Sequence, residues 1–285
     1  GKYRLSGKVK ALIVTGCLAQ RYREEILKEI PEVDAVLGTA SYDDILEAVE
    51  KTLKGEKYLS FRPTDRLVDT GGGRIITTGG AYEYLRIAEG CAKHCTYCVI
   101  PKVRGGYRSI PMERLLDTAR QMVGEGVKEL IVIAQETTLY GTDLYGKKSL
   151  HILLEKLCRI EGLVWIRLLY CYPEEIYPEL VDTIAREPKI CHYLDLPIQH
   201  CSDSILKRMG RKTTKADLER IITEIRERIP DMVIRTTLIT GFPGETKEDH
   251  EELMQFVADM AFDRLGVFTY SPEEDTPAAA MENQV

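Results

Sequence analysis

Three cysteines lie within one stretch of eight residues, at Cys91, Cys95 and Cys98. Closely spaced cysteine thiolates are the usual ligands of iron–sulfur clusters. Three thiolates hold three corners of a four-iron cube, so one iron is left without a protein ligand. A substrate or cofactor could bind at that iron. The stretch therefore predicts an iron–sulfur site with an open coordination position.

Two other interpretations of this stretch stay open. A structural zinc site would need a fourth ligand nearby, and His94 could supply it. Zinc sites usually come as two cysteine-bearing halves, however, and no second half follows. The three cysteines could also be ordinary core thiols. A non-catalytic metal-binding module is therefore one of the functions to test.

The elements around the cysteines place them at the end of a strand. The apolar run 84–88 reads as a strand, and Glu89 and Gly90 form a turn that lets the chain curl into the cysteine loop.

The composition limits the class of protein. The chain has 285 residues, which fits one barrel-sized domain and a smaller one, and its hydrophobic content of 44% is ordinary for a globular protein. A net charge of −6 argues against a broad electrostatic interface with nucleic acid, which normally needs a basic surface. We expect no membrane span and no signal peptide. Eight cysteines, clustered rather than spread, point to metal binding in a reducing cytoplasm.

The spacing C-x-x-x-C-x-Φ-C, with Tyr97 at the aromatic position, resembles the signature of the radical S-adenosylmethionine (SAM) enzymes. Over nearly its whole length the chain resembles the methylthiotransferases among them. The resemblance implies a [4Fe–4S] cluster on Cys91, Cys95 and Cys98, with SAM at the open iron and Tyr97 beside it. Such enzymes make a 5′-deoxyadenosyl radical, which takes hydrogen from an unactivated carbon.

The first part of the chain reads as a βαβα fragment, with strands at 8–16 and 33–37 and helices at 20–30 and 42–54. By resemblance, residues 1–54 are the C-terminal part of an α/β methylthiotransferase N-terminal domain. Residues 55–82 are rich in glycine and polar residues and read as a linker, with one short strand at 74–78.

From residue 83 onward strands and helices alternate regularly, which predicts a parallel sheet with helical crossovers. The expected strands are 84–89, 128–134, 164–170, 191–196, 232–239 and 264–270. The expected helices are 112–124, 149–160, 174–186, 202–209, 214–228 and 246–260. Six units match the family's partial (β/α)6 TIM-like barrel, here 83–275. Residues 276–285 would begin the linker to a TRAM-like β-domain that this sequence lacks.

Two segments at strand ends could bind SAM, because barrel chemistry lies at the carboxyl ends of the strands. Glu136 follows the second strand and could accept hydrogen bonds from the SAM ammonium; a solvated or helix-capping glutamate is the alternative. On the fifth strand, Arg235 could grip the SAM carboxylate, and Gly241 and Gly244 allow close backbone approach. The alternative there is a glycine turn before a helix that Thr246 caps.

Other candidates are weaker. The basic loop 101–109 could neutralise an acidic substrate or the cluster, although a solvated charge run is the default. His200, in a loop after the fourth strand, receives no catalytic role. The remaining cysteines read as inert core thiols: Cys158, Cys171, Cys191 and Cys201.

Cys17 follows a strand and resembles the third cysteine of a second cluster in the family's N-terminal domain. The two other ligands would lie upstream of Gly1, so this chain would not complete that second [4Fe–4S] cluster alone.

Two segments indicate the substrate branch. Residues 133–144 and the strand end 167–173 resemble the branch that methylthiolates the β-carbon of an aspartate in small-subunit ribosomal protein twelve. The expected partners are that protein and an electron donor such as flavodoxin or ferredoxin. The alternative is the branch that methylthiolates an adenosine in transfer RNA.

Overall fold

The computed structural model describes residues 3, 6–67, 76 and 79–285. The chain divides into two compact units, which are described separately. The first comprises Gly1–Arg74, Gly90–Ala92 and Ile100–Arg108; the second comprises Ile75–Glu89, Lys93–Val99 and Ser109–Val285. Cys91 thus belongs to the first unit, and Cys95 and Cys98 belong to the second. The domain limits predicted from the sequence remain predictions.

The first unit is built on a parallel sheet of three strands in the order β1-β2-β3. These strands are β1 (Ile13–Thr15), β2 (Ala35–Leu37) and β3 (Tyr58–Ser60). Its helices are α2 (Cys17–Tyr22), α3 (Glu25–Glu29), α4 (Ile45–Leu53) and α5 (Ile100–Arg104), with a 3-10 turn, η1, at Tyr42–Asp44. Val36 packs with Ala19 of α2, whereas its neighbours Ala35 and Leu37 pack with Ala48 of α4. The alternation of side chains along β2 therefore buries both faces of the sheet.

Several details of the first unit differ from the sequence-based expectation. The helix expected at 20–30 is two short helices, because Arg23 adopts a left-handed φ of 46° and breaks the turn between them. The strand expected at 8–16 is only three residues long. Residues 58–60, expected in a linker, form β3 and pair with β2. The strand expected at 74–78 falls almost entirely outside the described residues.

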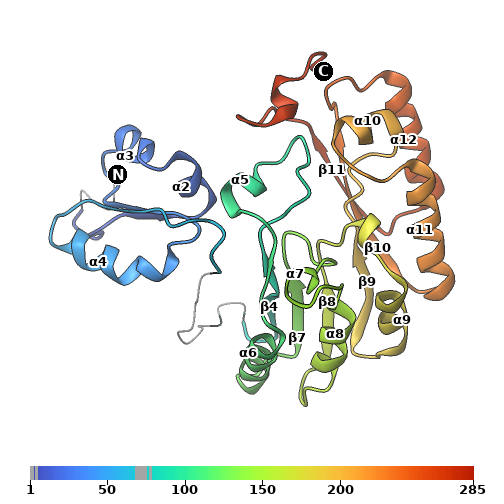
Figure 1. The fold of residues 1–285 in the computed structure, drawn as a ribbon, viewed down its shortest axis with the longest axis horizontal. Helices are drawn as coiled ribbons and strands as arrows, with labels where there is room; N and C mark the ends of the chain where they lie inside the picture. The colour runs from blue at the N-terminus through green and yellow to red at the C-terminus, as the bar shows by residue number, and fades with distance from the viewer. Residues whose placement is uncertain (1–2, 4–5, 68–75, 77–78) are drawn as a thin grey trace. The chain divides into compact units, whose positions relative to one another are not determined.

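The second unit is built on a parallel sheet of six strands in the order β11-β10-β9-β8-β7-β4 (Figure 1). The strands are β4 (Tyr82–Arg86), β7 (Glu129–Ile133), β8 (Trp165–Leu168), β9 (Ile190–Asp195), β10 (Val233–Thr240) and β11 (Arg264–Thr269). All six predicted strands are confirmed, in sequential order and parallel. A further two-stranded sheet joins β5 (Ala88–Glu89) and β6 (Arg108–Ser109).

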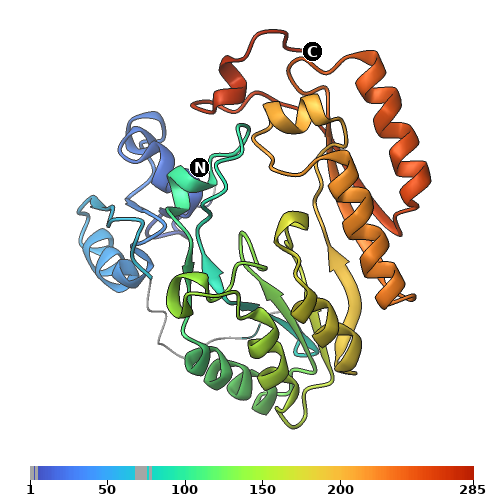
Figure 2. The same ribbon diagram turned by 45° about the vertical axis from the view of Figure 1, so that its right-hand side comes forward.

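Helices cover one face of this sheet (Figure 2). They are α6 (Met112–Gly124), α8 (Leu150–Cys158), α9 (Pro178–Arg186), α11 (Lys215–Arg228) and α12 (Lys247–Met260), and the short α10 (Asp203–Arg208) precedes α11. The buried residues of α11 recur at helical spacing, at Leu218, Ile221, Ile222 and Ile225. Along the strands the buried residues alternate with a period of two. On β7, Leu130 and Val132 are buried, while Ile131 between them is half-buried. Every second strand residue therefore faces away from the helices.

The sheet is open. Among the described residues no pairing joins the edge strands β4 and β11, and the six strands form an arc (Figure 2). This is the partial (β/α)6 barrel expected from the resemblance. The helix expected at 174–186 begins only at Pro178, a favoured first helical residue, after a 3-10 turn, η2 (Pro173–Glu175). The short helix α7 (Thr142–Tyr145) and the 3-10 turn η3 (Pro277–Ala280) were not expected either.

In the part of the chain that the structure describes, no helix combines the length and apolar character that a membrane span requires.

Candidate functional site

The cysteine loop begins directly after β5. Cys91 and Cys95 are each only 5% exposed, and Cys98 is half-buried. The Cys98 amide donates a hydrogen bond to the Cys95 carbonyl over 3.0 Å, which closes a turn between these two ligands. The Cys91 amide donates to the Gly105 carbonyl over 3.2 Å. The backbone around each thiol is therefore held by hydrogen bonds.

No three His, Cys, Asp or Glu side chains of the described residues gather around a position for a single metal ion. His94, the candidate zinc ligand, is exposed and has a left-handed φ of 53°. A four-iron cube does not require such a gathering, because its thiolates bind separate irons at separate corners. The donor set, three thiols on one short loop, fits a cluster of this kind.

Thr96 anchors the cysteine loop within the second unit. Its amide donates to the Met209 carbonyl over 3.0 Å, and its hydroxyl donates to the Arg208 carbonyl over 2.8 Å. Its own carbonyl accepts from the Ala278 amide over 2.9 Å. Thr96 thus binds both the end of α10 and the η3 turn, and so fixes the segment between Cys95 and Cys98.

Tyr97, the aromatic residue of the motif, packs into a small hydrophobic cluster. Its ring meets that of Phe242 edge-on, with centroids 6.3 Å apart. Phe242 lies in the turn after β10 and is fully buried with Ile205 and Met209. Burial, and then the charge of Cys95, raise the pKa of Tyr97 well above its usual value. The phenol therefore stays neutral, and the ring joins the cysteine loop to the turn after β10.

Glu136 lies just beyond the carboxyl end of β7 and is completely buried. Its Oε1 accepts a hydrogen bond from the Thr138 amide over 2.9 Å and another from the Thr138 hydroxyl. Its Oε2 is buried and has no hydrogen-bond partner among the described residues. Burial raises the pKa of Glu136 to about 7. A buried carboxyl oxygen without a partner is costly, and a cationic ligand would remove that cost.

Arg235 is linked to the same edge of the sheet by a chain of hydrogen bonds. The Thr137 amide, next to Glu136, donates to the Tyr170 carbonyl over 3.0 Å. The Tyr170 amide donates to Oδ2 of Asp195 over 3.1 Å, and Nη1 of Arg235 donates to Oδ1 of Asp195 over 2.5 Å. The structure thus places Glu136 and Arg235 in one layer across β7 to β10. The guanidinium of Arg235 is held by Asp195, a partner that the sequence had not assigned to it.

The two glycines after β10 differ in their surroundings. Gly241 has a φ of 71°, and a Cβ built on it would meet no atom within 4 Å, so the backbone there borders open space. Gly244 has a φ of 85°, and a Cβ there would lie 2.7 Å from Cζ of Arg208. The space that Gly244 leaves is therefore taken by Arg208. The alternative interpretation of this segment, a glycine turn before a capped helix, is confirmed, because Thr246 and Asp249 form a capping box at the start of α12.

The structure adds a group of charged residues that sequence reasoning missed. Lys93, inside the cysteine motif, forms ion pairs with Glu175 and, at 3.6 Å, with Glu174. Oη of Tyr172 lies 3.9 Å from Sγ of Cys95, and the Arg211 guanidinium lies 4.4 Å from the centre of the Tyr172 ring. The position of Lys93 in the motif was the only sequence signal, because its acidic partners come from η2, about 80 residues further along the chain.

In the first unit, Cys17 is the first residue of α2 and is half-buried. Nε of Arg104 donates a hydrogen bond to its Sγ over 3.1 Å. Arg104 belongs to α5, so the segment 101–109, expected as a basic loop, is partly helical. Arg108 donates to the carbonyls of Gly106 and Arg104, the latter over 2.9 Å. The guanidinium of Arg108, one of the cations expected to neutralise a substrate or the cluster, is therefore hydrogen-bonded to backbone carbonyls.

The remaining cysteines are shielded. Cys158, Cys171 and Cys201 are buried, Cys191 is half-buried, and burial raises the pKa of all four thiols. His200 is fully buried, and its Nδ1 accepts a hydrogen bond from the Ser202 amide over 3.0 Å. Burial lowers the pKa of His200. These placements agree with structural roles.

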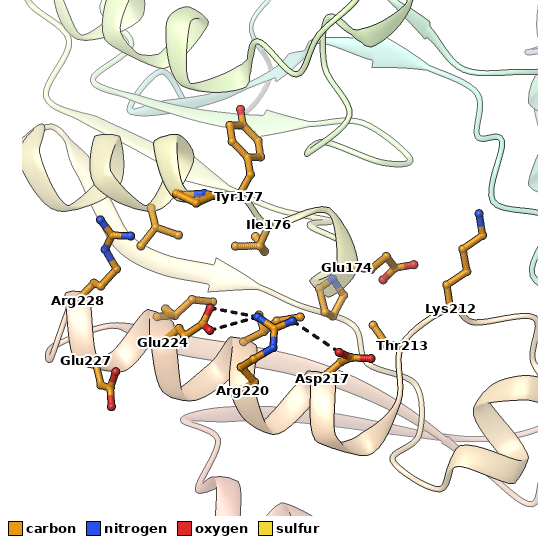
Figure 3. A pocket seen from close by; sticks show the side chains of 15 residues that line it. Glu174, Ile176, Tyr177, Lys212, Thr213, Asp217, Arg220, Glu224, Glu227 and Arg228 are labelled. Atoms are coloured by element: carbon orange, nitrogen blue, oxygen red, sulfur yellow. Dashed lines mark hydrogen bonds and ion pairs between the residues drawn. The ribbon is translucent and has the colours of Figure 1, made fainter.

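A groove of about 470 Å³ lies between α9, η2 and α11 (Figure 3). Along the α11 wall of this groove, Arg220 binds Glu224 over 3.2 Å and Asp217 over 3.6 Å. Its lining contains none of the site residues predicted from the sequence. We assign this groove no ligand.

Comparison with known proteins identifies the family. The model of the radical SAM superfamily matches residues 85–257. The chain is 63% identical over its full length to the ribosomal protein uS12 methylthiotransferase RimO of Lachnoclostridium phytofermentans. It is 53% identical, over 97% of its length, to the protein of the same name from Clostridium tetani. The chain spans 64% and 62% of the lengths of these two relatives.

Solved structures show the same fold at low identity. The radical enzyme OxsB, with aqua-cobalamin and SAM bound, covers 97% of this chain with a TM-score of 0.64 and 14% identity, over 42% of its own chain. The methyltransferase TsrM of Kitasatospora setae, with cobalamin and a [4Fe–4S] cluster, covers 69% with a TM-score of 0.57 and 20% identity, over 38% of its own chain. The chain belongs to the radical SAM superfamily, and within it the chain resembles the RimO methylthiotransferases.

Proposed function

We propose that this chain is the radical SAM part of a methylthiotransferase that modifies the β-carbon of an aspartate in ribosomal protein uS12. The observation that carries the proposal is the 63% identity to a RimO protein over all of this chain, with the three-cysteine loop at the end of the first barrel strands. The reaction would take place in the cytoplasm, where free thiols stay reduced.

We assign the cluster ligands to the loop after β5, and the SAM site to residues that include Glu136, just beyond β7, and Arg235, the third residue of β10. Cys91, Cys95 and Cys98 would ligate a [4Fe–4S] cluster. Glu136 would accept hydrogen bonds from the SAM ammonium through Oε2, which is buried without a partner among the described residues. Arg235, oriented by Asp195, would interact with the SAM carboxylate.

Tyr97 and Gly241 complete the proposed SAM site. Tyr97 holds the cysteine loop against the turn after β10 through its contact with Phe242. Gly241 leaves space next to the backbone at the end of β10, so an adenosine group could approach it closely. The open arc of the sheet would receive the substrate protein.

A reduced cluster held by Cys91, Cys95 and Cys98, with SAM bound, would supply the radical chemistry for removing hydrogen from the aspartate β-carbon, where the methylthio group would be added. A flavodoxin or ferredoxin would deliver the electrons. Cys17 would ligate a second [4Fe–4S] cluster in the full-length protein. The barrel residues bind and orient the reactants and exclude water from them.

Anaerobic reconstitution with iron and sulfide, followed by SAM and a strong reductant, tests the radical chemistry. We expect 5′-deoxyadenosine from the wild-type chain and none from a Cys95→Ala variant. Cys158→Ala is the matched control, because Cys158 is a buried thiol on α8. Equal product from wild type and Cys95→Ala would contradict the cysteine assignment.

The substrate is tested separately. The full-length protein, with the second cluster loaded, should methylthiolate uS12 and leave transfer RNA unmodified. Modification of an adenosine in transfer RNA instead would assign the protein to the other branch. A wild-type chain that retains zinc and no iron after anaerobic isolation would favour the non-catalytic module.

A further inference from the structure

Arg211, just beyond α10, is a buried arginine for which the proposed function provides no role. Its side chain is only 1% exposed. Nη2 donates to the Pro197 carbonyl over 3.2 Å and lies 3.4 Å from Oε2 of Glu174. Nε and Nη1 are buried and have no hydrogen-bond partner among the described residues. A guanidinium in this position is costly unless some other group balances its charge.

The position of Arg211 indicates which group that is. Its guanidinium stacks on the Tyr172 ring at 4.4 Å from the ring centre, and Oη of the same tyrosine lies 3.9 Å from Sγ of Cys95. The charge of Arg211 also acts on Tyr97, where it opposes the rise in the pKa of that phenol. The arginine therefore lies within electrostatic reach of two residues of the cysteine motif.

The acidic residues nearby do not neutralise this charge. Glu174 and Glu175 are the two carboxylates of the group, and they face three cations. Lys93 pairs with both of them, Lys148 lies 2.8 Å from Oε2 of Glu175, and Arg211 shares Glu174. Among these five groups, positive charges outnumber negative ones by one as long as Glu136 is protonated. Glu136 interacts electrostatically with Lys93 and Glu175. Burial raises its pKa to about 7, so below pH 7 it is largely protonated.

We propose that Arg211 is a positioning residue that supplies the positive charge balancing the iron–sulfur cluster at Cys91, Cys95 and Cys98. The inference rests on the proposed function, because it requires a cluster on these cysteines. Three thiolates give an oxidised [4Fe–4S] centre a charge of −1, and one electron from a low-potential donor makes it −2. No bond forms or breaks in this step.

The direction in which Arg211 would shift the reduction potential of the cluster follows from this change from −1 to −2. A nearby buried cation stabilises the doubly negative form more than the singly negative form, so it raises the reduction potential. Because the guanidinium is shielded from water, screening by salt is weak. The Arg211–Tyr172 stack also holds the phenol beside Cys95, so one residue sets both the charge and the geometry on this side of the loop.

The test is a redox titration of the reconstituted chain, followed by the electron paramagnetic resonance signal of the reduced cluster. Arg211→Met removes the charge at similar length, and we expect the equilibrium constant for one-electron reduction to fall at least tenfold, which is 59 mV. Arg211→Lys should stay within threefold of wild type. Glu174→Gln removes a negative charge and should shift the potential upward, which gives an independent test if Arg211→Met does not fold.

Arg226→Met is the matched control. Arg226 lies on α11 and donates to the Met260 carbonyl over 2.6 Å, so its loss removes one positive charge away from the cysteine loop. If the reduction potential is unchanged in Arg211→Met, the proposed role of Arg211 is wrong. The same holds if Arg226→Met lowers the potential by as much as Arg211→Met does. Neither result would contradict the proposed function. If the Arg211 variant does not fold, an unchanged or lower reduction potential in Glu174→Gln would contradict the role of Arg211. A wild-type chain that binds no cluster, or binds one equally well after Cys95→Ala, would overturn the proposed function as well.

Discussion

Arg104 donates a hydrogen bond from Nε to Sγ of Cys17 over 3.1 Å, within the first unit of the chain. The two residues come from α5 and α2, helices that are far apart in the sequence. Thr39 adds a second link to α5, because its hydroxyl donates to the Val103 carbonyl over 2.6 Å. Cys17 is therefore held in place by the helix that follows the three-cysteine loop.

Replacing Arg104 should loosen this contact. We expect Arg104→Met to lower the free energy of unfolding by about 1 kcal/mol, the usual net contribution of a protein hydrogen bond. Urea unfolding would measure the change. Lys102→Met, on the same helix, leaves the bond to Cys17 in place and serves as the control. Equal losses in the two variants would mean that the bond contributes no stability.

Glu136 should make stability depend on pH. Its folded pKa, about 7, lies above its ordinary value of 4.5 because of burial. The folded chain therefore binds the proton more tightly than the unfolded chain. The stabilisation is complete below pH 4.5 and is lost as the pH rises to 7.

The loss corresponds to roughly 3 kcal/mol across that pH window. Glu136→Gln cannot titrate, so its free energy of unfolding should fall less between pH 5 and pH 8 than that of wild type. Urea unfolding at the two pH values tests this, with Glu113→Gln, an exposed glutamate of α6, as the control. Parallel pH profiles for wild type and Glu136→Gln would contradict the prediction.

Asp195 should be important for stability because it is almost fully buried and binds both Arg235 and the Tyr170 amide. Asp195→Asn removes the charge while keeping the shape, and we expect a loss of about 2 kcal/mol, in the range for hydrogen bonds to charged groups.

The control is Asp231→Asn, since the carboxyl of Asp231 is 75% exposed and pairs only with His192 among the contacts described for it. Exposed pairs of this kind contribute little. A melting experiment that found the two asparagine variants equally stable would show that the Asp195–Arg235 pair does not stabilise this layer.

Phe242 joins the turn after β10 to the cysteine loop. It is fully buried and meets Tyr97 and Tyr270 edge-on, with the centroid of Tyr270 5.2 Å away. Phe242→Ala should cost about 3–5 kcal/mol, as for other buried aromatic residues.

Phe268→Ala is the control, because that ring is 61% exposed on β11, and its loss should change the free energy of unfolding by less than about 0.5 kcal/mol. Denaturant unfolding followed by circular dichroism compares the two. A small loss in Phe242→Ala would mean that the cluster around Tyr97 is loosely packed.

The sequence alone was sufficient for features that depend on neighbours along the chain. The spacing of Cys91, Cys95 and Cys98 places three thiols on one loop whatever the rest of the fold, and the alternation of apolar segments predicted all six barrel strands in order. The capping box of Thr246 was also visible, because its two partners lie three residues apart. Local spacing and periodicity determine such features.

Only the tertiary structure showed which distant groups share an environment. The chain of contacts from Glu136 to Arg235 depends on which strands are adjacent, and the position of Arg211 beside Tyr172 depends on how η2 and the end of α10 pack. The third strand of the first unit was missed because β3 is short and is stabilised by pairing with β2 rather than by its own pattern. Burial and charge act through space, so the pKa of Glu136 and the burial of Arg211 could not be read from residue order.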